Sequence, residues 1–424
     1  MSRQYLFPQK FLRKYVILIF TSAVMFSACH SAKRTAQIDY LQPDATKDKP
    51  LTIQKKRTIA FENSGVWVSN QFAGGRLNDF TRVNDSVFTA LIKPENAPVN
   101  NSAWYAFKIW GNSPKTVSVK LTYDDGDHRY HPKISGDGEH WQQLADQFYS
   151  EDTATGSATI RLNISPDTLW IAAQELFTSK DFDRRIAAFA EKPFVQKSVL
   201  GNSKRGKTIH KLEITEAENP SRYVAIISRQ HPPEVTGTYA LMAFLDALCD
   251  DSPLAQRFRR EFSTIVIPLM NPDGVDNGHW RHNAGGIDLN RDWMYFNQPE
   301  TRLASNEFLK IKNDPAKQLY FFLDFHSTQR DVFYTLDKNL ETIPPQMTDT
   351  WLAEIQKRLP AYKVVERPYG TESPVSKSWF YLTFQVPSIT YEIGDDTPPE
   401  TTRQVAGVAA TVLMEQLLAY IEKN

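Results

Sequence analysis

The chain has 424 residues, and its 49 Lys and Arg side chains balance its 49 Asp and Glu side chains. A net charge of zero argues against a polyanion as partner, so we expect no binding to nucleic acid. The length is sufficient for two domains that each bury a sizeable core.

Residues 1–28 have the pattern of a signal peptide. Basic side chains come first, an apolar run begins at Tyr15, and small residues precede Cys29. This order resembles a bacterial lipoprotein signal, in which cleavage before Cys29 leaves a thiol that carries the lipid. We therefore expect an exported protein anchored to the membrane of the cell envelope. The absence of an acidic run after Cys29 favours the periplasmic side. An ordinary secretory signal or an uncleaved anchor is the alternative.

Residues 29–55 are rich in Lys, Asp, Thr and Gln and have almost no apolar pattern. We expect a flexible tether there. The only cysteine besides Cys29 is Cys249, which cannot form an internal disulfide once Cys29 carries a lipid. We interpret Cys249 as a small structural residue without a catalytic role.

An all-β sandwich domain is predicted over 56–185. Apolar and polar side chains alternate over 117–123 and 160–164, which is typical of strands with one buried face. Clusters of Asp and Gly at 124–127 and 136–138 indicate turns between strands.

The same region contains several large aromatic side chains. They include Trp67, Trp104, Trp110, Trp141 and Trp170. We interpret them as filling of the core or of a domain interface, because aromatic side chains are common in β cores. A carbohydrate-binding surface is the alternative, since flat rings stack on sugars.

The pattern changes after a predicted helix at 181–190 to alternating strands and helices. Short apolar runs of the kind found in buried central strands occur at 223–227, 263–267, 319–323 and 388–391. Helical spacing of apolar residues occurs between the first two runs and near the C-terminus. We predict an α/β domain over 195–424 with one central sheet and its site at the strand ends.

Potential metal ligands follow two of these runs. His231 and Glu234 are separated by two prolines, which exclude a helix interior and place the pair in a tight loop. His326 follows another run and offers a third ligand. Three protein ligands leave a fourth position for water, the arrangement of catalytic zinc. The pair His279 and His282 is a weaker rival, because no third ligand accompanies it.

Four segments in fixed order carry a family resemblance. They are HPPE at 231–234, NPDGV at 271–275 with DLNRDW at 288–293, FHS at 325–327 and YE at 391–392. As a set they resemble the zinc carboxypeptidases related to carboxypeptidases A and B. The stretch 271–293 is most similar to the cytosolic carboxypeptidase branch, which also has a β domain before the catalytic one. The resemblance implies a central mixed sheet.

The resemblance also implies roles for individual residues. His231, Glu234 and His326 would bind Zn²⁺. Glu392 would be the general base that takes a proton from the attacking water and delivers it to the leaving amine. Arg281 would stabilise the oxyanion.

The substrate's terminal carboxylate would bind to Asn290 and Arg291, because a guanidinium group matches the shape of a carboxylate. Asp288 would orient the first zinc histidine.

The chain departs from the family at the substrate subsites. Pro233 stands where the digestive members have an arginine. The residue nearest in spacing to their substrate-capping tyrosine is Tyr369. Lys377 aligns with the position that sets side-chain preference, where a lysine favours an acidic terminal residue. A solvated lysine on a loop is the alternative.

We predict a zinc-dependent metallocarboxypeptidase that removes the C-terminal residue of a peptide, and the lysine at position 377 favours acidic terminal residues. Alternatives within enzymes are a peptidase that trims the stem peptides of murein and a small-molecule deacylase. The alternative outside enzymes is a lipoprotein with a degenerate site that binds a glycan or a partner. The sequence does not indicate an oligomeric state.

Overall fold

The computed structural model describes residues 46–424, so the predicted signal peptide and Cys29 lie outside the described residues. The described part of the predicted tether, 46–55, contacts the folded protein. Gln54 is buried and donates to the backbone oxygen of Asn277 over 2.8 Å, and Thr46 donates to that of Gly286. Thr46 and Gln54 are thus held by the folded protein, whereas residues 47–50 between them are exposed.

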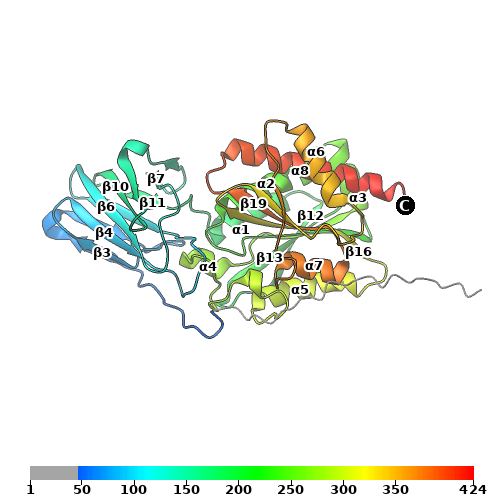
Figure 1. The fold of residues 1–424 in the computed structure, drawn as a ribbon, viewed down its shortest axis with the longest axis horizontal. Helices are drawn as coiled ribbons and strands as arrows, with labels where there is room; N and C mark the ends of the chain where they lie inside the picture. Colours follow the sequence, from blue (N-terminus) through cyan, green and yellow to red (C-terminus); the bar gives the residue numbers. More distant parts are fainter. Residues whose placement is uncertain (1–45) are drawn as a thin grey trace, which may run out of the picture. The chain divides into compact units, whose positions relative to one another are not determined.

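Two sheets form the N-terminal sandwich (Figure 1). The six-stranded sheet consists, in spatial order, of β1 (Thr58–Phe61), β2 (Val66–Ser69), β5 (Ala106–Gly111), β11 (Leu169–Ala172), β7 (Lys133–Ser135) and β8 (Gln142–Gln143). The five-stranded sheet consists of β3 (Asp79–Arg82), β4 (Val87–Ile92), β6 (Lys115–Tyr123), β10 (Ser157–Ile164) and β9 (Tyr149–Asp152). Short 3₁₀ turns occur at Glu62–Ser64 and Asp146–Phe148.

The core of the sandwich lies between these sheets. Alternate residues of β6 and β10 are buried, as the two-residue period predicted. Rings from the two sheets meet there: the centroids of Phe61 and Phe88 lie 5.4 Å apart, and those of Phe80 and Phe107 lie 6.2 Å apart.

The tryptophans of the sandwich divide between the core and the outer face. Trp104 is buried, which confirms the core interpretation for this residue. Trp67 and Trp110 are half-buried and directly opposite each other in β2 and β5. Because the neighbours Val66 and Val68 are buried, the Trp67 side chain points to the outer face of its sheet.

The C-terminal region is built on one eight-stranded mixed sheet. In spatial order its strands are β12 (Val195–Asn202), β13 (Thr208–Ile214), β15 (Ser263–Ile267), β14 (Arg222–Ser228), β16 (Gln318–Thr328), β19 (Ser388–Gly394), β17 (Val332–Thr335) and β18 (Glu366–Pro368). The central strands β15, β14, β16 and β19 are parallel, and the pairs β12/β13, β13/β15 and β17/β19 are antiparallel. The four predicted runs all lie in this sheet.

Helices cover both faces of the mixed sheet (Figure 1). The helices are α1 (Ser179–Ala190), α2 (Val235–Leu248), α3 (Pro253–Glu261), α4 (Pro272–Asn277), α5 (Pro299–Lys312), α6 (Met347–Arg358), α7 (Ser376–Phe384) and α8 (Pro399–Ile421), with a 3₁₀ turn at Leu289–Arg291. One core lies under α2, α3, α6 and α8, and another lies under α5 and α7. Val224 and Ile226 of β14 enter the first core and Ala225 and Ile227 the second, so β14 is apolar on both faces.

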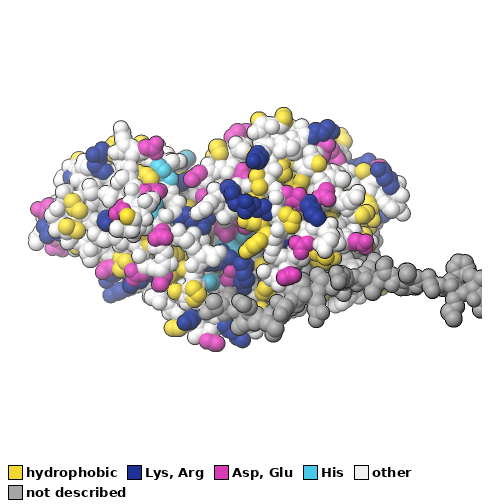
Figure 2. Space-filling model, in the orientation of Figure 1, with side chains coloured by type: hydrophobic (Ala, Val, Ile, Leu, Met, Phe, Trp, Pro, Cys, Tyr) yellow, Lys and Arg dark blue, Asp and Glu magenta, His cyan; other side chains and the backbone are white. Residues whose placement is uncertain are grey.

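Charged side chains of both signs are interspersed over the visible face of the molecule (Figure 2). This distribution agrees with the balance of charge in the sequence.

Candidate active site

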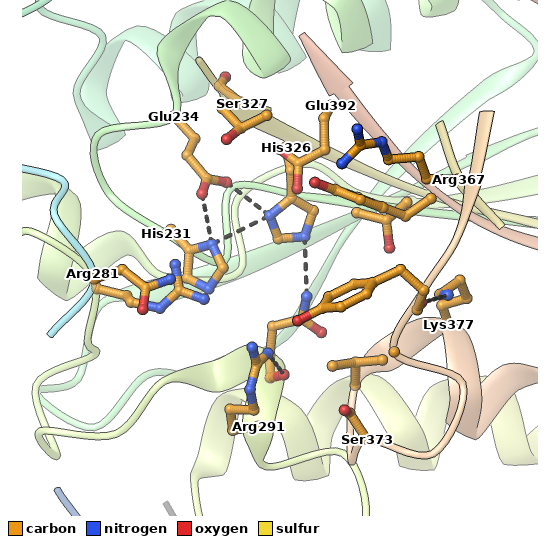
Figure 3. Close-up of a pocket in the computed structure, with 18 of the residues that line it drawn as sticks. His231, Glu234, Arg281, Arg291, His326, Ser327, Arg367, Ser373, Lys377 and Glu392 are labelled. Atoms are coloured by element: carbon orange, nitrogen blue, oxygen red, sulfur yellow. Dashed lines mark hydrogen bonds and ion pairs between the residues drawn. The ribbon is translucent and has the colours of Figure 1, made fainter. Parts of the chain in front are cut away.

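Two imidazoles and a carboxylate converge in the C-terminal region (Figure 3). Nδ1 of His231 lies 2.7 Å from Oε1 of Glu234, and Nδ1 of His326 lies 2.7 Å from Oε2 of the same carboxylate. The two Nδ1 atoms lie 3.2 Å apart. Two facing nitrogens and a shared carboxylate fit a divalent cation such as Zn²⁺ at their centre. Within residues 46–424, these three residues form the only grouping with metal-ligand spacing.

The loop between β14 and α2 places His231 and Glu234. Arg229 adopts a positive φ of 56° at the end of β14, and its buried guanidinium donates to the backbone oxygen of Pro232 over 2.8 Å. Helix α2 then begins directly after Glu234. A Cβ on Gly237 would lie 2.5 Å from the backbone oxygen of His326, so only glycine lets α2 approach β16 at this point.

A carboxylate holds the outer nitrogen of each imidazole. Nε2 of His231 lies 2.8 Å from Oδ1 of Asp288, and Nε2 of His326 lies 2.9 Å from Oδ2 of Asp324. Such partners orient metal-binding histidines and make them stronger ligands. Burial alone would raise the pKa of Asp288, but the charges of Arg281 and His231 hold it well below its usual range.

Asp324 is a site residue that the sequence analysis missed. It precedes His326 by two positions in β16, so both side chains point to the same face of the sheet. Its Oδ2 also accepts from Nε2 of Gln230 over 2.6 Å and from Oγ of Ser376 over 2.5 Å. The signal was present in the sequence as a carboxylate two residues before a potential ligand.

Glu392 lies beside His326 because the two residues are register partners in the parallel strands β19 and β16. The predicted strand 319–323 continues to Thr328, so His326 lies within the strand rather than after it. Oε2 of Glu392 is buried and has no hydrogen-bond partner among the described residues. Burial raises the pKa of Glu392 to about 8. A buried carboxylate with a free oxygen and a pKa near neutrality is suited to move protons.

The 3₁₀ turn at Leu289–Arg291 brings three further predicted residues together. Nε of Arg281 donates to Oδ2 of Asp288 over 2.7 Å. Asn290 accepts from the backbone N–H of Ser376 over 2.9 Å, and Nη1 of Arg291 donates to the backbone oxygen of Asn290 over 2.7 Å. Arg281, Asn290 and Arg291 all line one cavity with the convergent His231, Glu234 and His326.

This cavity has a volume of about 660 Å³. Beyond the predicted residues, its wall includes Tyr334, Glu366 and Arg367 on strands at the edge of the mixed sheet. It also includes side chains of the sandwich region: Asn100, Ser102 and Arg129. No short motif marks these sandwich residues, so sequence analysis could not assign them to the site.

Lys377 and Tyr369 also line the cavity, but in different environments. Lys377 lies at the start of α7 and is 2% exposed, so the alternative of a solvated loop lysine is wrong. Its Nζ donates to the backbone oxygens of Thr335, over 2.7 Å, and of Tyr369. Burial lowers the pKa of Lys377 to about 7. Tyr369 is 67% exposed and lies next to Tyr334, with 5.5 Å between ring centroids.

The rival pair His279 and His282 does not converge on a common point. Nδ1 of His279 lies 2.9 Å from the backbone oxygen of His282, and Nδ1 of His282 lies 2.6 Å from Oδ1 of Asn96. Both imidazoles therefore have structural partners, and they are not part of the grouping with metal-ligand spacing.

Comparison with known proteins agrees with this geometry. The family model for zinc carboxypeptidases matches residues 185–407. An uncharacterised protein of Zymomonas mobilis is 24% identical over 82% of this chain and 96% of its own length. Cytosolic carboxypeptidase 6 of Mus musculus is 23% identical over 60% of this chain, and cytosolic carboxypeptidase 2 of Homo sapiens is 24% identical over 68%. The chain covers 52% of the first of these two carboxypeptidases and 35% of the second.

Solved structures share the fold. A metallo-carboxypeptidase from Burkholderia cenocepacia has a TM-score of 0.71 at 18% identity, covering 84% of this chain and 99% of its own. One from Pseudomonas aeruginosa has a TM-score of 0.68 at 18% identity, covering 82% and 98%. The predicted fold, a zinc carboxypeptidase-like mixed sheet after a β-rich region, is confirmed. With a family model that spans more than half of its length, this chain belongs to the zinc carboxypeptidase family.

Proposed function

We propose that the protein removes the C-terminal residue of a peptide by hydrolysis. The observation that supports this most directly is the free, buried oxygen of Glu392 beside His326, in the same cavity as His231 and Glu234. Such an arrangement combines a place for a metal with a base of suitable pKa. The matched relatives and the family model support the same class of reaction.

Zinc is the metal of this family, and His231, Glu234 and His326 would hold it. When bound, zinc supplies a Lewis acid that makes water a stronger nucleophile at neutral pH. Glu392 then accepts the proton of the attacking water on Oε2 and passes it to the nitrogen of the leaving amino acid.

Arg281 stabilises the negative charge that develops on the carbonyl oxygen. Its Nε is engaged by Asp288, so its terminal nitrogens are the donors that remain for the substrate. Asp288 thus orients both Arg281 and His231 from one carboxylate.

Asn290 and Arg291 bind the terminal carboxylate of the substrate. Oδ1 of Asn290 already accepts from Ser376, so the substrate would be bound by the N–H groups of Nδ2, which lies 3.5 Å from Nε2 of His326. The Arg291 side chain is 39% exposed, so a substrate can reach its guanidinium from the cavity. A carboxylate recognised in this way confines cleavage to the end of a chain.

A peptide library with varied C-terminal residues tests the proposal. The purified protein is incubated with the library, with murein stem peptides and with N-acyl amino acids, and the products are identified by mass spectrometry. Loss of single C-terminal residues from library peptides is the expected result. Cleavage of stem peptides alone would assign the protein to wall remodelling, and cleavage of acyl amino acids alone would make it a deacylase. If zinc-loaded protein cleaves none of them, hydrolysis of these classes is excluded.

We further propose that Lys377 favours an acidic terminal side chain. Lys377 lines the cavity, and its pKa is about 7. Its ammonium group is therefore charged below pH 7 and loses its charge as the pH rises through that value. In the same library, the ratio of rates for peptides ending in Glu and in Gln is therefore expected to fall above pH 7. Lys377→Met keeps an unbranched side chain, one atom shorter than lysine, but has no charge, so its ratio should be low and independent of pH. An unchanged ratio in this variant would contradict the role.

The lipoprotein signal supports a proposal on location, although Cys29 lies outside the described residues. The protein would be exported and anchored by a lipid on Cys29, on the periplasmic side. Cell fractionation of the full chain and of Cys29→Ala tests this proposal. Equal recovery of both in the membrane fraction would contradict it.

A further inference from the structure

A carboxylate of the sandwich region holds the chain segment that carries Arg281. Glu95 follows β4, and its side chain is fully buried at 0% exposure. Oε2 of Glu95 accepts from the backbone N–H of Trp280 over 2.7 Å. Oε1 accepts from the backbone N–H groups of Arg281, over 3.0 Å, and of His282, over 2.6 Å. Three consecutive backbone amides therefore donate to one carboxylate, which belongs to a residue at least 185 positions earlier in the sequence.

The neighbours of Glu95 reinforce this attachment. Oδ1 of Asn96 lies 2.6 Å from Nδ1 of His282, and Nδ2 of Asn96 donates to the backbone oxygen of Gly286 over 3.1 Å. Nε1 of Trp280 donates to the backbone oxygen of Trp104 over 3.0 Å. The segment 280–286 is thus held at several points by residues of the sandwich.

The carboxylate of Glu95 is ionised in this setting. Burial alone would raise its pKa, but the imidazole of His282, whose Nδ1 lies 3.3 Å from Oε1 of Glu95, and the nearby His279 and Arg76 hold the pKa well below its usual range. Hydrogen bonds to a charged acceptor are stronger than those between neutral groups. The three amides are therefore held more firmly than ordinary loop amides.

The contacts of Arg281 continue from Glu95 to the cluster of convergent ligands. Its backbone N–H is bound by Glu95, and its Nε is bound by Oδ2 of Asp288. The other oxygen of Asp288 lies 2.8 Å from Nε2 of His231. Both the backbone and the side chain of Arg281 are thus fixed relative to His231. In this series of contacts, Glu95 is the residue that the sandwich supplies.

We infer that Glu95 is a positioning residue for the hydrolysis: it fixes the backbone of Arg281 so that the guanidinium meets the developing negative charge. This inference rests on the proposed function. Donors that stabilise a transition state must be held in place before the reaction, and a shift of about 1 Å can lower the rate by roughly 100-fold. The sandwich would thus contribute to catalysis by holding Arg281 in position.

Glu95→Gln tests the inference with little change in shape. The amide nitrogen of Gln would face backbone N–H groups, so at least one of these bonds is lost. We expect kcat to fall by roughly 100-fold while KM changes by less than about 3-fold, because Asn290 and Arg291 still bind the terminal carboxylate. The matched control is Glu175→Gln. Oε2 of Glu175 accepts from the hydroxyl of Tyr239, on α2, over 2.5 Å instead of from amides of the segment 280–282; its variant should stay within about 3-fold of the wild-type kcat.

A double variant separates positioning from a general loss of stability. If Glu95 acts through Arg281, Arg281→Ala with Glu95→Gln should be no slower than Arg281→Ala alone, within about 3-fold. Multiplicative losses in the double variant would contradict the inference. So would a kcat of Glu95→Gln equal to that of Glu175→Gln.

A second measurement does not depend on activity. Amide hydrogen exchange of the segment 280–282, followed by mass spectrometry, should be faster in Glu95→Gln than in wild type and in Glu175→Gln. If wild type hydrolyses no peptide, the proposed function fails but this measurement still decides whether Glu95 holds the segment. If Glu95→Gln does not fold, Glu95→Asp serves in both assays. Aspartate keeps the charge, but its side chain is one methylene shorter, so the carboxylate lies farther from the amides of 280–282. Unchanged exchange in either variant would overturn the inference.

Discussion

Glu392→Gln is expected to reduce kcat by roughly 10⁴-fold, at the upper end of the range for general acid–base catalysis, because one carboxylate serves both proton transfers. The amide has nearly the same shape but cannot accept and release a proton. Zinc content, measured by atomic absorption, should be unchanged, since Glu392 is not one of the three convergent ligands.

Glu300→Gln is the control for loss of a buried carboxylate. The Glu300 side chain is fully buried, and it accepts from the backbone N–H of Lys204 over 2.9 Å and from Nδ2 of Asn283 over 3.0 Å. It does not line the cavity that contains Glu392. We expect this variant to retain most of the wild-type rate. A Glu392→Gln enzyme with a near wild-type rate would show that another group is the base.

Removal of zinc is expected to abolish hydrolysis and to lower the unfolding temperature. Without a cation, the facing nitrogens of His231 and His326 and the buried carboxylate of Glu234 lose their common partner. At a zinc concentration 1,000 times its dissociation constant, binding stabilises the folded state by about 4 kcal/mol, or roughly 5 °C for a chain of this size. Calorimetry of the protein with and without chelator measures the shift.

The assignment of ligands has its own control. His326→Gln should lose zinc, whereas His279→Gln should keep it, because His279 is bonded to the backbone of His282 instead. Zinc should restore activity to the chelated wild type, and Mg²⁺ should not, because Mg²⁺ prefers oxygen ligands in octahedral geometry. Retention of stoichiometric zinc by His326→Gln would mean that the metal lies elsewhere.

Local patterns predicted the sheet because strand side chains alternate with a period of two residues and buried central strands are apolar on both faces. The end of β16 was not predicted. The apolar run stops at Leu323, but the strand continues through the polar Asp324 and His326 to Thr328. A buried polar group in a strand needs partners, and those of Oδ2 of Asp324, Gln230 and Ser376, come from other elements.

The burial of Lys377 could not be predicted from the neighbouring sequence either. A lysine near turn residues is typical of a solvated surface, yet here helix α7 buries it against the backbone oxygens of Thr335 and Tyr369. Burial of an ammonium group depends on acceptors that arrive from distant strands.

By itself, the sequence determined the class of protein, the four parallel strands at the centre of the eight-stranded sheet and the identity of the residues that converge on the metal position. It could do so because metal ligation and proton transfer require particular side chains, and the segments that carry them can be recognised by their order along the chain. Only the tertiary structure decided that His326 and Glu392 are neighbours in register, that Asp324 supports His326, and that Glu95 holds Arg281. These contacts are set by how strands pair and how the sandwich meets the mixed sheet, which no local pattern encodes.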